Sequence, residues 1–437
     1  MTIPLQAEID IESLDHEGRG VAHDTTGKTV FIEGALPGER VHYAVDQERP
    51  RFAVGHAVTI VRASGQRVTP PCPLYGECGG CVMQHLEYSA QTAAKQRVLE
   101  DALWHLGRLR IPQIFAPIQG SQWGYRQRAR IGMRQIVGKG MYIGFRRRHS
   151  SYLCDMMACP VLPQRLSSLL LPLHTLVAGL STADQMPQLE FAAGEEGMVL
   201  GLRHLMPLTV EDKARLRHFA AEHQVMIGLQ PGGPQTLRAL EASQSLMLSY
   251  RLPEYNVTVR FLPTDFTQVN PQTNALLVHR AMQWLAPQPG ERIADMFCGL
   301  GNFSLPMARL GAAVVGVEGH AGLVQRAADN AADNGLAPTC RFYTANLFEI
   351  TPHGFASMGQ FDKMLIDPPR EGAAALVQAL DMETAPRRIV YVSCNPATLA
   401  RDAAILIHQK HYRLCAAGIA NMFPHTAHVE SIALFER

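Results

Sequence analysis

The residue best suited to chemistry is a cysteine that directly follows an apolar run. Cys394 lies in the stretch Val392-Ser393-Cys394-Asn395-Pro396, between a predicted strand and a predicted helix. Open α/β sheets bind substrates at the carboxyl ends of their strands, and a helix N-terminus lowers the pKa of a nearby thiol. We therefore predict that Cys394 reacts as a thiolate, in preference to the commoner role of a small buried residue.

The thiolate at Cys394 would need a base as its partner in catalysis, and the sequence offers candidates for this base near the C-terminus. Addition of a thiolate to C6 of uracil makes C5 a nucleophile that can attack the methyl group of a sulfonium, and a base must then remove the C5 proton. The candidates are Glu430, His425 and His428. A partly desolvated carboxylate has a raised pKa that suits this proton transfer. The residues leave the choice open, and an ordinary surface position for Glu430 has about equal weight.

A glycine-rich segment, Asp295-Met-Phe-Cys-Gly-Leu-Gly-Asn302, predicts a nucleoside site. It follows an apolar strand and leads into a helix, so its glycines allow a tight turn beside free helix N–H groups. Glu318 ends the next predicted strand, where a carboxylate can accept both hydroxyls of a ribose. The third glycine of a dinucleotide motif is absent, and the segment resembles motif I of S-adenosyl-L-methionine-dependent methyltransferases.

The next two predicted strands also end in polar side chains. Asn346 follows the third strand and suits an adenine edge, while Asp367-Pro-Pro-Arg370 follows the fourth. The latter resembles the Asp/Asn-Pro-Pro element of methyltransferases that act on planar nitrogenous substrates. Four matched strand ends favour this interpretation over an α/β domain that binds another nucleotide or has lost its function.

A second set of cysteines predicts a metal centre. Cys72, Cys78 and Cys81 lie in one glycine-containing loop, and Cys159 precedes a proline much later in the chain. Four thiolates can hold a [4Fe–4S] cluster or a tetrahedral zinc ion. The spacing differs from the paired CxxC of zinc ribbons, so we predict the cluster. Cys154 competes as fourth ligand, and the Cys-Pro sequence favours Cys159.

The charges are balanced in total but not in distribution. The chain has 40 Lys and Arg against 39 Asp and Glu. Residues 1–62 carry ten acidic and six basic side chains, whereas residues 126–148 carry eight basic and no acidic ones. The alternation of Arg126, Arg128 and Arg130 would place three guanidinium groups on one face of a strand. With aromatic residues interleaved, this segment predicts contacts to RNA phosphates and bases.

Three domains are expected to position these residues. Five short predicted strands, the first from Gln6 to Leu14, indicate a small closed barrel of the OB type in residues 1–62. Residues 63–265 are predicted as an α+β domain with the iron–sulfur site and an antiparallel sheet, whose segment 85–115 is expected to pack with the catalytic domain. Residues 266–437 alternate strands and helices, which predicts a doubly wound Rossmann-like methyltransferase domain.

Length and composition exclude several classes of protein. A chain of 437 residues with 47% hydrophobic and 18% charged residues predicts a multidomain globular protein. No apolar run reaches the length of a membrane helix, and the acidic N-terminus lacks a signal-peptide core. We expect a cytoplasmic protein, a monomer without an obligate protein partner, and no disulfide framework.

In combination, these motifs resemble the RNA uracil-5-methyltransferase family. The matching segments, in chain order, are Asp295–Phe303, Asp367–Arg370, Val392–Pro396 and His425–Glu430. A TRAM-like barrel and the four-cysteine pattern extend the resemblance over nearly the whole chain. Barrel and cluster together are similar to the members that methylate uracil 1939 of bacterial 23S rRNA, since tRNA-directed relatives lack both. Some close relatives have Asp-Pro-Ala-Arg where this chain has Asp-Pro-Pro-Arg.

The resemblance implies a role for each matched residue. Cys394 would be the nucleophile, Glu430 would accept the C5 proton, and Phe266 would stack on a uracil flipped out of folded RNA. The S-adenosyl-L-methionine site would be formed by Gln268, Phe297, Asn302, Glu318, Asn346 and Asp367. The alternatives are the same chemistry on another rRNA or tRNA uracil, and a non-catalytic iron–sulfur protein that binds RNA.

Overall fold

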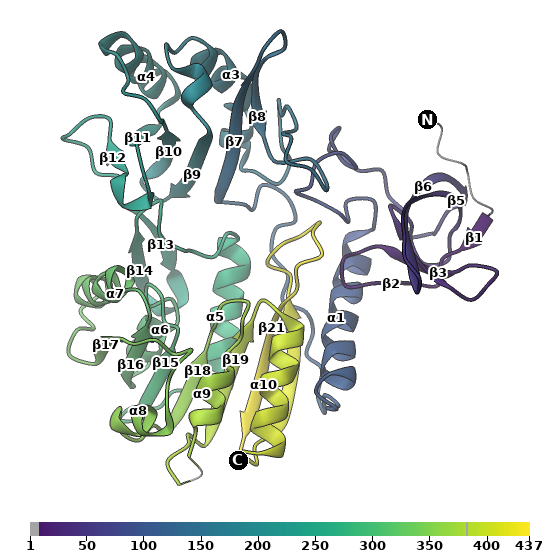
Figure 1. Ribbon diagram of the computed structural model, residues 1–437. Coiled ribbons are helices and arrows are strands. Elements are labelled where there is room, and N and C mark those ends of the chain that lie inside the picture. The colour runs from purple at the N-terminus through teal and green to yellow at the C-terminus, as the bar shows by residue number, and fades with distance from the viewer. Residues whose placement is uncertain (1–7, 382) are drawn as a thin grey trace. The chain divides into compact units, whose positions relative to one another are not determined.

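The computed structural model describes residues 8–381 and 383–437 (Figure 1). Gln6 and Ala7, the start of the first predicted strand, lie outside these residues. The chain forms two compact units. One contains Met1–Val98, Phe145–Cys154 and Phe423–His428, and the other contains Leu99–Gly144, Asp155–Met422 and Val429–Arg437. The division into three domains at residues 62 and 265 stays a prediction.

The first unit contains a six-stranded barrel. Its strands follow the order β1-β5-β6-β4-β3-β2. The segment that holds β1 and β2 pairs first with β5 and then with β3, so one stretch of chain closes both edges of the sheet. This confirms the predicted barrel, except that the first predicted strand is divided in two. The strands are β1 (Glu8–Asp10), β2 (Ser13–Leu14), β3 (Gly20–His23), β4 (Thr29–Glu33), β5 (Arg40–Glu48) and β6 (Phe52–Arg62).

The barrel core is apolar because alternate residues of each strand face inward. Ile9, Val30, Ile32 and Val41 are among its buried members. A second apolar cluster joins Leu36 to Met83, Leu86 and Ala90, which belong to the cysteine-bearing loop and to the start of helix α1 (Tyr88–His105). Burial of these side chains fixes the loop that carries Cys72, Cys78 and Cys81.

The second unit begins with a mixed sheet of order β12-β11-β10-β9-β7-β8. The prediction of an antiparallel sheet is wrong for one pair, because β10 and β11 are parallel. Helix α4 connects these two strands, as a parallel crossover requires. The elements are β7 (Arg128–Ile136), β8 (Gly140–Gly144), α2 (Gln164–Ser167), α3 (Leu170–Ala178), β9 (Gln188–Gly194), β10 (Gly197–Arg203), α4 (Val210–His223), β11 (Met226–Gln230) and β12 (Arg238–Ala239).

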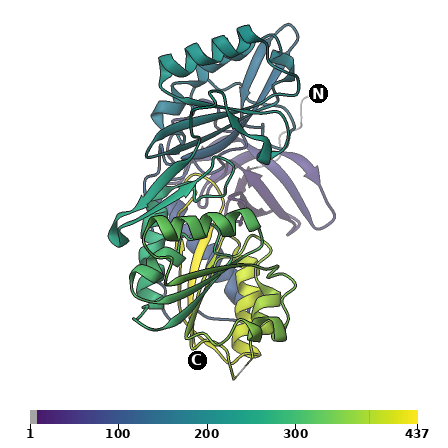
Figure 2. The same cartoon turned by 90° about the vertical axis from the view of Figure 1, so that its left-hand side faces the viewer.

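The same unit contains the predicted doubly wound domain. Its seven strands follow the order β17-β16-β15-β18-β19-β21-β20, and helices cover both faces of the sheet (Figure 2). Only β21 runs in the opposite direction, antiparallel to both of its neighbours, β19 and β20. The strands are β15 (Arg292–Met296), β16 (Ala313–Glu318), β17 (Cys340–Thr344), β18 (Lys363–Ile366), β19 (Arg388–Ser393), β20 (Arg413–Ala420) and β21 (Glu430–Glu436).

Helices α5 and α10 of this domain begin with side-chain caps. In α5 the side chain of Asn270 accepts a hydrogen bond from the Thr273 N–H, and in α10 that of Asn395 accepts one from Ala397. Each of these helices starts with proline, which lacks an N–H that would need a partner. The helices are α5 (Pro271–Leu285), α6 (Ser304–Arg309), α7 (Ala321–Asp333), α8 (Pro352–Ser357), α9 (Ala374–Ala379) and α10 (Pro396–His408).

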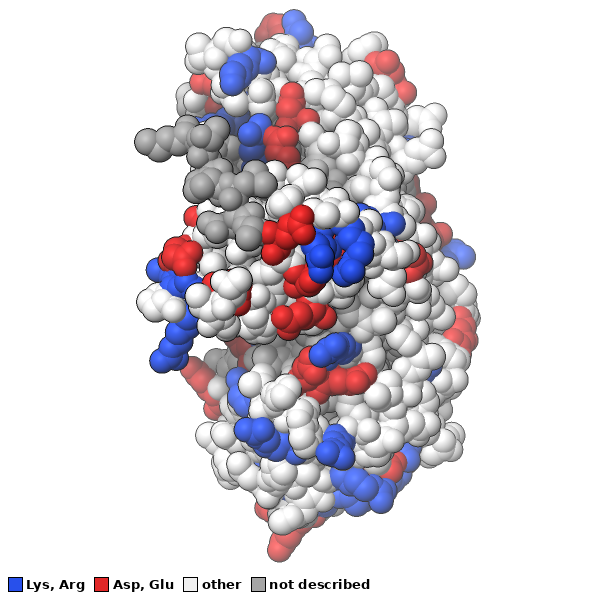
Figure 3. Space-filling model, turned by 90° about the vertical axis from the view of Figure 1, so that its right-hand side faces the viewer, with Lys and Arg blue, Asp and Glu red and all other residues white. Residues whose placement is uncertain are grey.

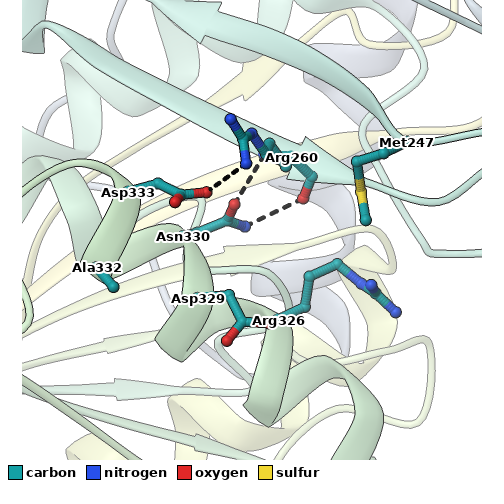
Figure 4. Close-up of a pocket in the computed structure, with 7 residues that line it drawn as sticks. All are labelled: Met247, Arg260, Arg326, Asp329, Asn330, Ala332 and Asp333. Atoms are coloured by element: carbon teal, nitrogen blue, oxygen red, sulfur yellow. Dashed lines mark hydrogen bonds and ion pairs between the residues drawn. The ribbon is translucent and has the colours of Figure 1, made fainter. Parts of the chain in front are cut away.

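A β-hairpin, β13 (Leu248–Leu252) and β14 (Val257–Phe261), is attached to helix α7 by two asparagines. Asn330 accepts from the N–H of Arg260 and donates to its carbonyl (Figure 4). Asn334 does the same with Thr258. Each side-chain amide therefore pairs with β14 as a neighbouring strand would. At about 1 kcal/mol for each hydrogen bond, these contacts hold the hairpin firmly on the sheet domain.

None of the helices in the described ranges combines the length and apolar content that a bilayer crossing requires.

Candidate active site

The strand register brings the predicted nucleophile and base together. Ser393, the last residue of β19, pairs with Ser431 of β21, and the Ser431 hydroxyl donates to the Ser393 carbonyl at 3.0 Å. Cys394 directly follows Ser393 and Glu430 directly precedes Ser431, and the charge of Glu430 acts on the Cys394 thiol, so the two side chains lie close together. Asp367 follows β18, the next strand in the sheet. The structure thus gathers a thiol and two carboxyl groups at adjacent strand ends.

The predicted lowering of the Cys394 pKa is wrong. Burial, followed by the charges of Glu430 and Asp367, raises the pKa of this thiol to about 11, and the smaller effects of Arg370 and of a backbone hydrogen bond lower it. Helix α10 does begin two residues later, but its influence is smaller than that of desolvation and two carboxylates. The free enzyme therefore holds Cys394 as a neutral thiol near neutral pH.

This raised pKa gives a measurable pH dependence. The rate of Cys394 alkylation by iodoacetamide, followed by mass spectrometry of the peptide, should rise about tenfold per pH unit through neutral pH, because only the thiolate reacts. The midpoint should lie near the thiol pKa of about 11. In Glu430→Gln the midpoint should move to lower pH, since one negative charge is gone. A midpoint below the ordinary thiol value in the wild-type protein would contradict this prediction.

Glu430 has the electrostatics of a proton acceptor. Its side chain is 3% exposed, and burial raises its pKa well above the ordinary value, with a further contribution from Asp367. Among the residues that the structure describes, we find no hydrogen-bond donor to its carboxyl group. A buried carboxylate without donors binds a proton more readily than an exposed one.

The two histidines proposed as alternative bases lie in the other compact unit. His425 is 2% exposed, and its Nδ1 lies 3.2 Å from Nε2 of Gln91. The ring of His428 packs against that of Phe423, with centroids 5.5 Å apart. Both belong to the segment Phe423–His428, whereas Glu430 belongs to the seven-stranded sheet. Of the three candidates, Glu430 is the one whose charge affects the pKa of Cys394.

The predicted nucleoside site lies at the ends of β15, β16 and β17. Phe297 has a left-handed backbone, with φ of 66°, and its ring lies 5.5 Å from that of Phe348. Glu318 accepts hydrogen bonds from the N–H groups of Gly299 at 3.3 Å and His320 at 3.0 Å. These backbone contacts hold the carboxylate at the strand end. Phe348, an exposed aromatic residue shortly after β17, was not among the residues predicted from the sequence.

Two further predicted residues have structural partners of their own. Asn346 is exposed, and its side chain accepts from the N–H of Phe348. Asn302 exchanges two hydrogen bonds with Asn274, at 2.9 and 3.0 Å, and also accepts from the Tyr250 hydroxyl at 2.9 Å. The side chain of Asn302 is therefore committed to orienting the glycine-rich loop. Asn274 and Tyr250 carry no sequence motif that would have indicated this role.

Asp295, the first residue of the glycine-rich segment, is completely buried. The hydroxyl of Ser304 donates to its carboxyl group, and burial raises its pKa to about 7. Burial also raises the pKa of Asp367 to about 7. Two carboxyl groups with raised pKa values at neighbouring strand ends are typical of a functional site.

The loop between β14 and α5 exposes the predicted base-stacking residue. Phe266 is 68% exposed, which is unusual for a ring of this size. Its neighbour Asp265 accepts from the N–H of Leu262 at 2.7 Å and forms an ion pair with Arg326 at 2.6 Å. Gln268, two residues further on, is half-buried. The ion pair fixes the loop while the aromatic ring stays accessible.

A pocket of about 340 Å³ lies between β14 and α7 (Figure 4). Its lining includes Arg260 and Arg326 together with Asp329 and Asp333. Arg260 is paired with Asp333 at 2.9 Å, and Arg326 with Asp265. Because each guanidinium has a carboxylate partner, this pocket has no surplus of positive charge.

The basic segment is more neutralised than its sequence indicates. Arg128 and Arg130 of β7 both reach Glu190 of β9, at 3.5 and 3.0 Å, and Arg128 is mostly buried. Arg130 is exposed, and Arg126 is half-buried. Acidic residues close in space thus compensate part of the charge. Most of the face in Figure 3 belongs to uncharged residues, and basic and acidic groups adjoin in its middle part. Arg130 is the best placed of the three for a phosphate.

The cysteines of the predicted metal site form no disulfide within the described residues. Cys72, Cys78, Cys81 and Cys154 lie in one compact unit, and Cys159 lies in the other. Cys78 and Cys154 interact directly, and burial followed by the proximity of Cys78 raises the pKa of Cys154 to about 12. Over the described ranges, no group of three metal-ligating side chains has the geometry to hold an ion.

Comparison with known proteins identifies the family. A profile described as tRNA (Uracil-5-)-methyltransferase matches residues 354–437, and a TRAM domain profile matches residues 6–58. The structure of Pyrococcus abyssi tRNA (uracil-54, C5)-methyltransferase in complex with S-adenosyl-L-homocysteine shares the fold. Its TM-score is 0.75 at 24% identity, covering 98% of this chain and 99% of that one.

Sequence relatives extend over the full length. The 23S rRNA (uracil(1939)-C(5))-methyltransferase RlmD of Aromatoleum aromaticum is 60% identical over 98% of this chain and 99% of its own. The proteins of that name from Azoarcus sp. and Nitrosospira multiformis are 57% and 54% identical, over 98% and 99% of this chain and 99% of each relative. The chain therefore belongs to the family of the 23S rRNA (uracil(1939)-C(5))-methyltransferases RlmD.

Proposed function

We propose that this protein transfers a methyl group from S-adenosyl-L-methionine to C5 of a uracil in 23S rRNA, uracil 1939 in the numbering used for its relatives. One observation carries the proposal: Cys394 and Glu430 are the direct neighbours of the paired residues Ser393 and Ser431, and the charge of Glu430 acts on the Cys394 thiol. A nucleophile that can add to C6 and a base that can remove the C5 proton are the two groups that this reaction requires. The full-length relatives named for the same reaction support it.

The proposed roles follow the chemistry of each side chain. Cys394 adds to C6, C5 takes the methyl group, and Glu430 accepts the C5 proton so that the C6–S bond breaks. The bound donor supplies a methyl sulfonium, whose positive charge opposes the effect of the carboxylates on the Cys394 pKa. Phe266, which is exposed, would stack on the flipped base.

The donor would be held at the strand ends of the parallel sheet. Glu318 is oriented by two backbone N–H groups, so it can accept ribose hydroxyls without rearrangement. The rings of Phe297 and Phe348 adjoin there and can contact an adenine. The other proposed contacts are Gln268, Asn302, Asn346 and Asp367.

We propose that Cys72, Cys78 and Cys81 hold a [4Fe–4S] cluster with Cys159 as the fourth ligand. A Cβ on Gly79 would lie 3.1 Å from the Arg146 carbonyl, so glycine lets the chain between Cys78 and Cys81 pass close to this backbone without crowding. Three thiols without disulfide partners are the donor type that iron prefers. The proximity of Cys154 to Cys78 keeps Cys154 as the competing ligand.

Cysteine substitutions should separate these ligand sets. Cys159→Ser in protein purified anaerobically should lower the iron content and the visible absorbance, because a serine oxygen is a poor ligand for the cluster. Cys154→Ser should keep both if Cys154 is only a buried neighbour. If Cys154→Ser loses the iron and the absorbance while Cys159→Ser keeps them, Cys154 is the fourth ligand. A colourless wild-type preparation that contains zinc would exclude the cluster.

The decisive test of the function is the identity of the methylated nucleotide. Purified protein, labelled S-adenosyl-L-methionine and 23S rRNA without its own C5 methylation should give one labelled 5-methyluridine, located by mass spectrometry of RNA fragments. The label should lie at uracil 1939. A label at another rRNA position, or only on tRNA, would assign the same chemistry to a different substrate, and no transfer at all would refute the proposal.

A further inference from the structure

The loop between β20 and β21 is held unusually tightly. The chain leaves the seven-stranded sheet at Ala420 and rejoins it at Glu430, and these two residues pair with each other. The residues Phe423–His428 between them belong to the compact unit that also contains the cysteine loop and the start of α1. The loop that leads directly into Glu430 is therefore built into another part of the molecule.

Every backbone polar group of His425 has a partner in that unit. Its N–H donates to the side-chain oxygen of Gln91 at 2.9 Å, and its carbonyl accepts from Val82 at 2.9 Å and Met83 at 3.0 Å. His425 has φ of 67°, a left-handed conformation that is costly for a residue with a side chain. The surrounding contacts impose this conformation, and Val82 directly follows Cys81.

Two side chains of α1 complete the attachment. Gln91 also donates from Nε2 to the Leu86 carbonyl at 2.8 Å, which fixes its orientation. Lys95 donates to the carbonyl of Phe423 at 2.8 Å. Gln91 is 1% exposed and Lys95 is 2% exposed, so no water competes with these bonds. Long polar side chains are rarely buried to this degree unless they have a specific partner.

Inside the loop, Thr426 adds local order. Its N–H and hydroxyl both donate to the Phe423 carbonyl, at 3.3 and 2.9 Å, and its oxygen accepts from the N–H of His428. The loop is thus fixed from the residue bound by Lys95 to the residue that stands two positions before Glu430. The carboxyl group of Glu430 itself has no hydrogen bond within the described structure that would orient it, so its position depends on its backbone.

We infer that Gln91 and Lys95 are positioning residues for Glu430: they lock the Phe423–His428 loop and thereby place the base that removes the C5 proton. The inference rests on the proposed function, since it requires Glu430 to act in the elimination step. It gives the cysteine-bearing segment a part in catalysis, because the backbone of Val82 and Met83 holds the same loop. A metal centre in that segment would stabilise the loop without any change in its oxidation state.

The test separates the two chemical steps. An RNA fragment with tritium at C5 of the target uracil releases tritium only when the base acts, whereas labelled methyl enters the covalent protein–RNA adduct before that. In Gln91→Met, tritium release should slow by roughly 10- to 100-fold, as expected for a misplaced catalytic group. Methyl entry in the first turnover should stay near the wild-type rate, so the methylated adduct should accumulate.

A second variant and a matched control guard against a folding defect. Lys95→Met breaks the other contact and should give the same separation of steps. Gln84→Met makes the same kind of change at another buried glutamine of this unit, which is 3% exposed and whose Oε1 has no hydrogen-bond partner among the described residues. This variant should behave like the wild type. Hydrogen exchange should be faster at residues 421–431 in both loop variants and unchanged in the control.

The outcomes are distinct. If the variants release tritium at the wild-type rate, or lose both steps equally, the positioning role is refuted while the proposed function stands. If the wild-type protein transfers no methyl group at all, the proposed function fails and the inference fails with it. A selective loss of tritium release with faster exchange of the loop supports the inference.

Discussion

Cys394→Ala is expected to abolish methyl transfer. Without a thiolate at C6, C5 of uracil is too weak a nucleophile to attack the methyl group, and removal of a catalytic nucleophile lowers turnover by roughly 10⁴-fold or more. The same variant should form no covalent complex with RNA that carries 5-fluorouracil at the target, since fluorine at C5 blocks the release of the normal adduct. Methyl transfer to labelled RNA and gel analysis of the adduct measure both effects.

The fold should survive this substitution. Cys394 is half-buried and has no disulfide partner, so its replacement by alanine removes little packing. Cys415→Ala is the matched control: Cys415 is also half-buried and lies in β20 of the same sheet, where its thiol contacts Glu436. Cys415→Ala should keep full activity. Residual methyl transfer by Cys394→Ala at more than a small fraction of the wild-type rate would refute the covalent mechanism.

The architecture was largely accessible from the sequence, because it rests on local patterns. Apolar runs followed by polar strand ends predicted the parallel sheet, and Gly and Pro turns predicted the barrel. The parallel pair β10–β11 was missed because alternating apolar residues do not distinguish parallel from antiparallel neighbours. The pairing of Cys394 with Glu430 was also out of reach, since the position of β21 between β19 and β20 is a property of the whole sheet.

The electrostatics of the site could not be predicted, because the relevant charges come from distant segments. The adjoining helix predicted a lowered pKa for Cys394, but burial, together with the charges of Glu430 and Asp367, raises it instead. In the same way, Arg128 and Arg130 stand in a segment without acidic residues, and their partner Glu190 comes from β9. A count of charges along the chain therefore overestimated the positive charge available to RNA.

Glu430→Gln is expected to stop the reaction after methyl transfer. Glutamine has the same shape but cannot accept the C5 proton, so turnover should fall by about 10²- to 10⁴-fold, the usual contribution of a general base. The methylated adduct should accumulate to one equivalent of enzyme, in contrast to Cys394→Ala, which forms none. Gel analysis with labelled methyl donor distinguishes the two. Glu436→Gln, in the same strand but paired with Arg388, is the control and should turn over normally.

Stability gives an independent check on the buried state of Glu430. Its pKa is raised in the folded protein, so the folded state binds the proton more tightly than the unfolded state does. The free energy of unfolding of the wild type therefore falls as the pH rises from the ordinary carboxyl pKa toward the raised pKa of Glu430. Glutamine does not ionise, so Glu430→Gln does not lose this stability. Glu430→Gln should accordingly melt at a higher temperature than the wild type above neutral pH, with the difference vanishing below about pH 4. If Glu430→Gln instead melted at a lower temperature than the wild type at alkaline pH, the ionised carboxylate of Glu430 would have a stabilising partner. Glu430 would then not be an unpaired buried base, and the accumulated adduct would need another explanation.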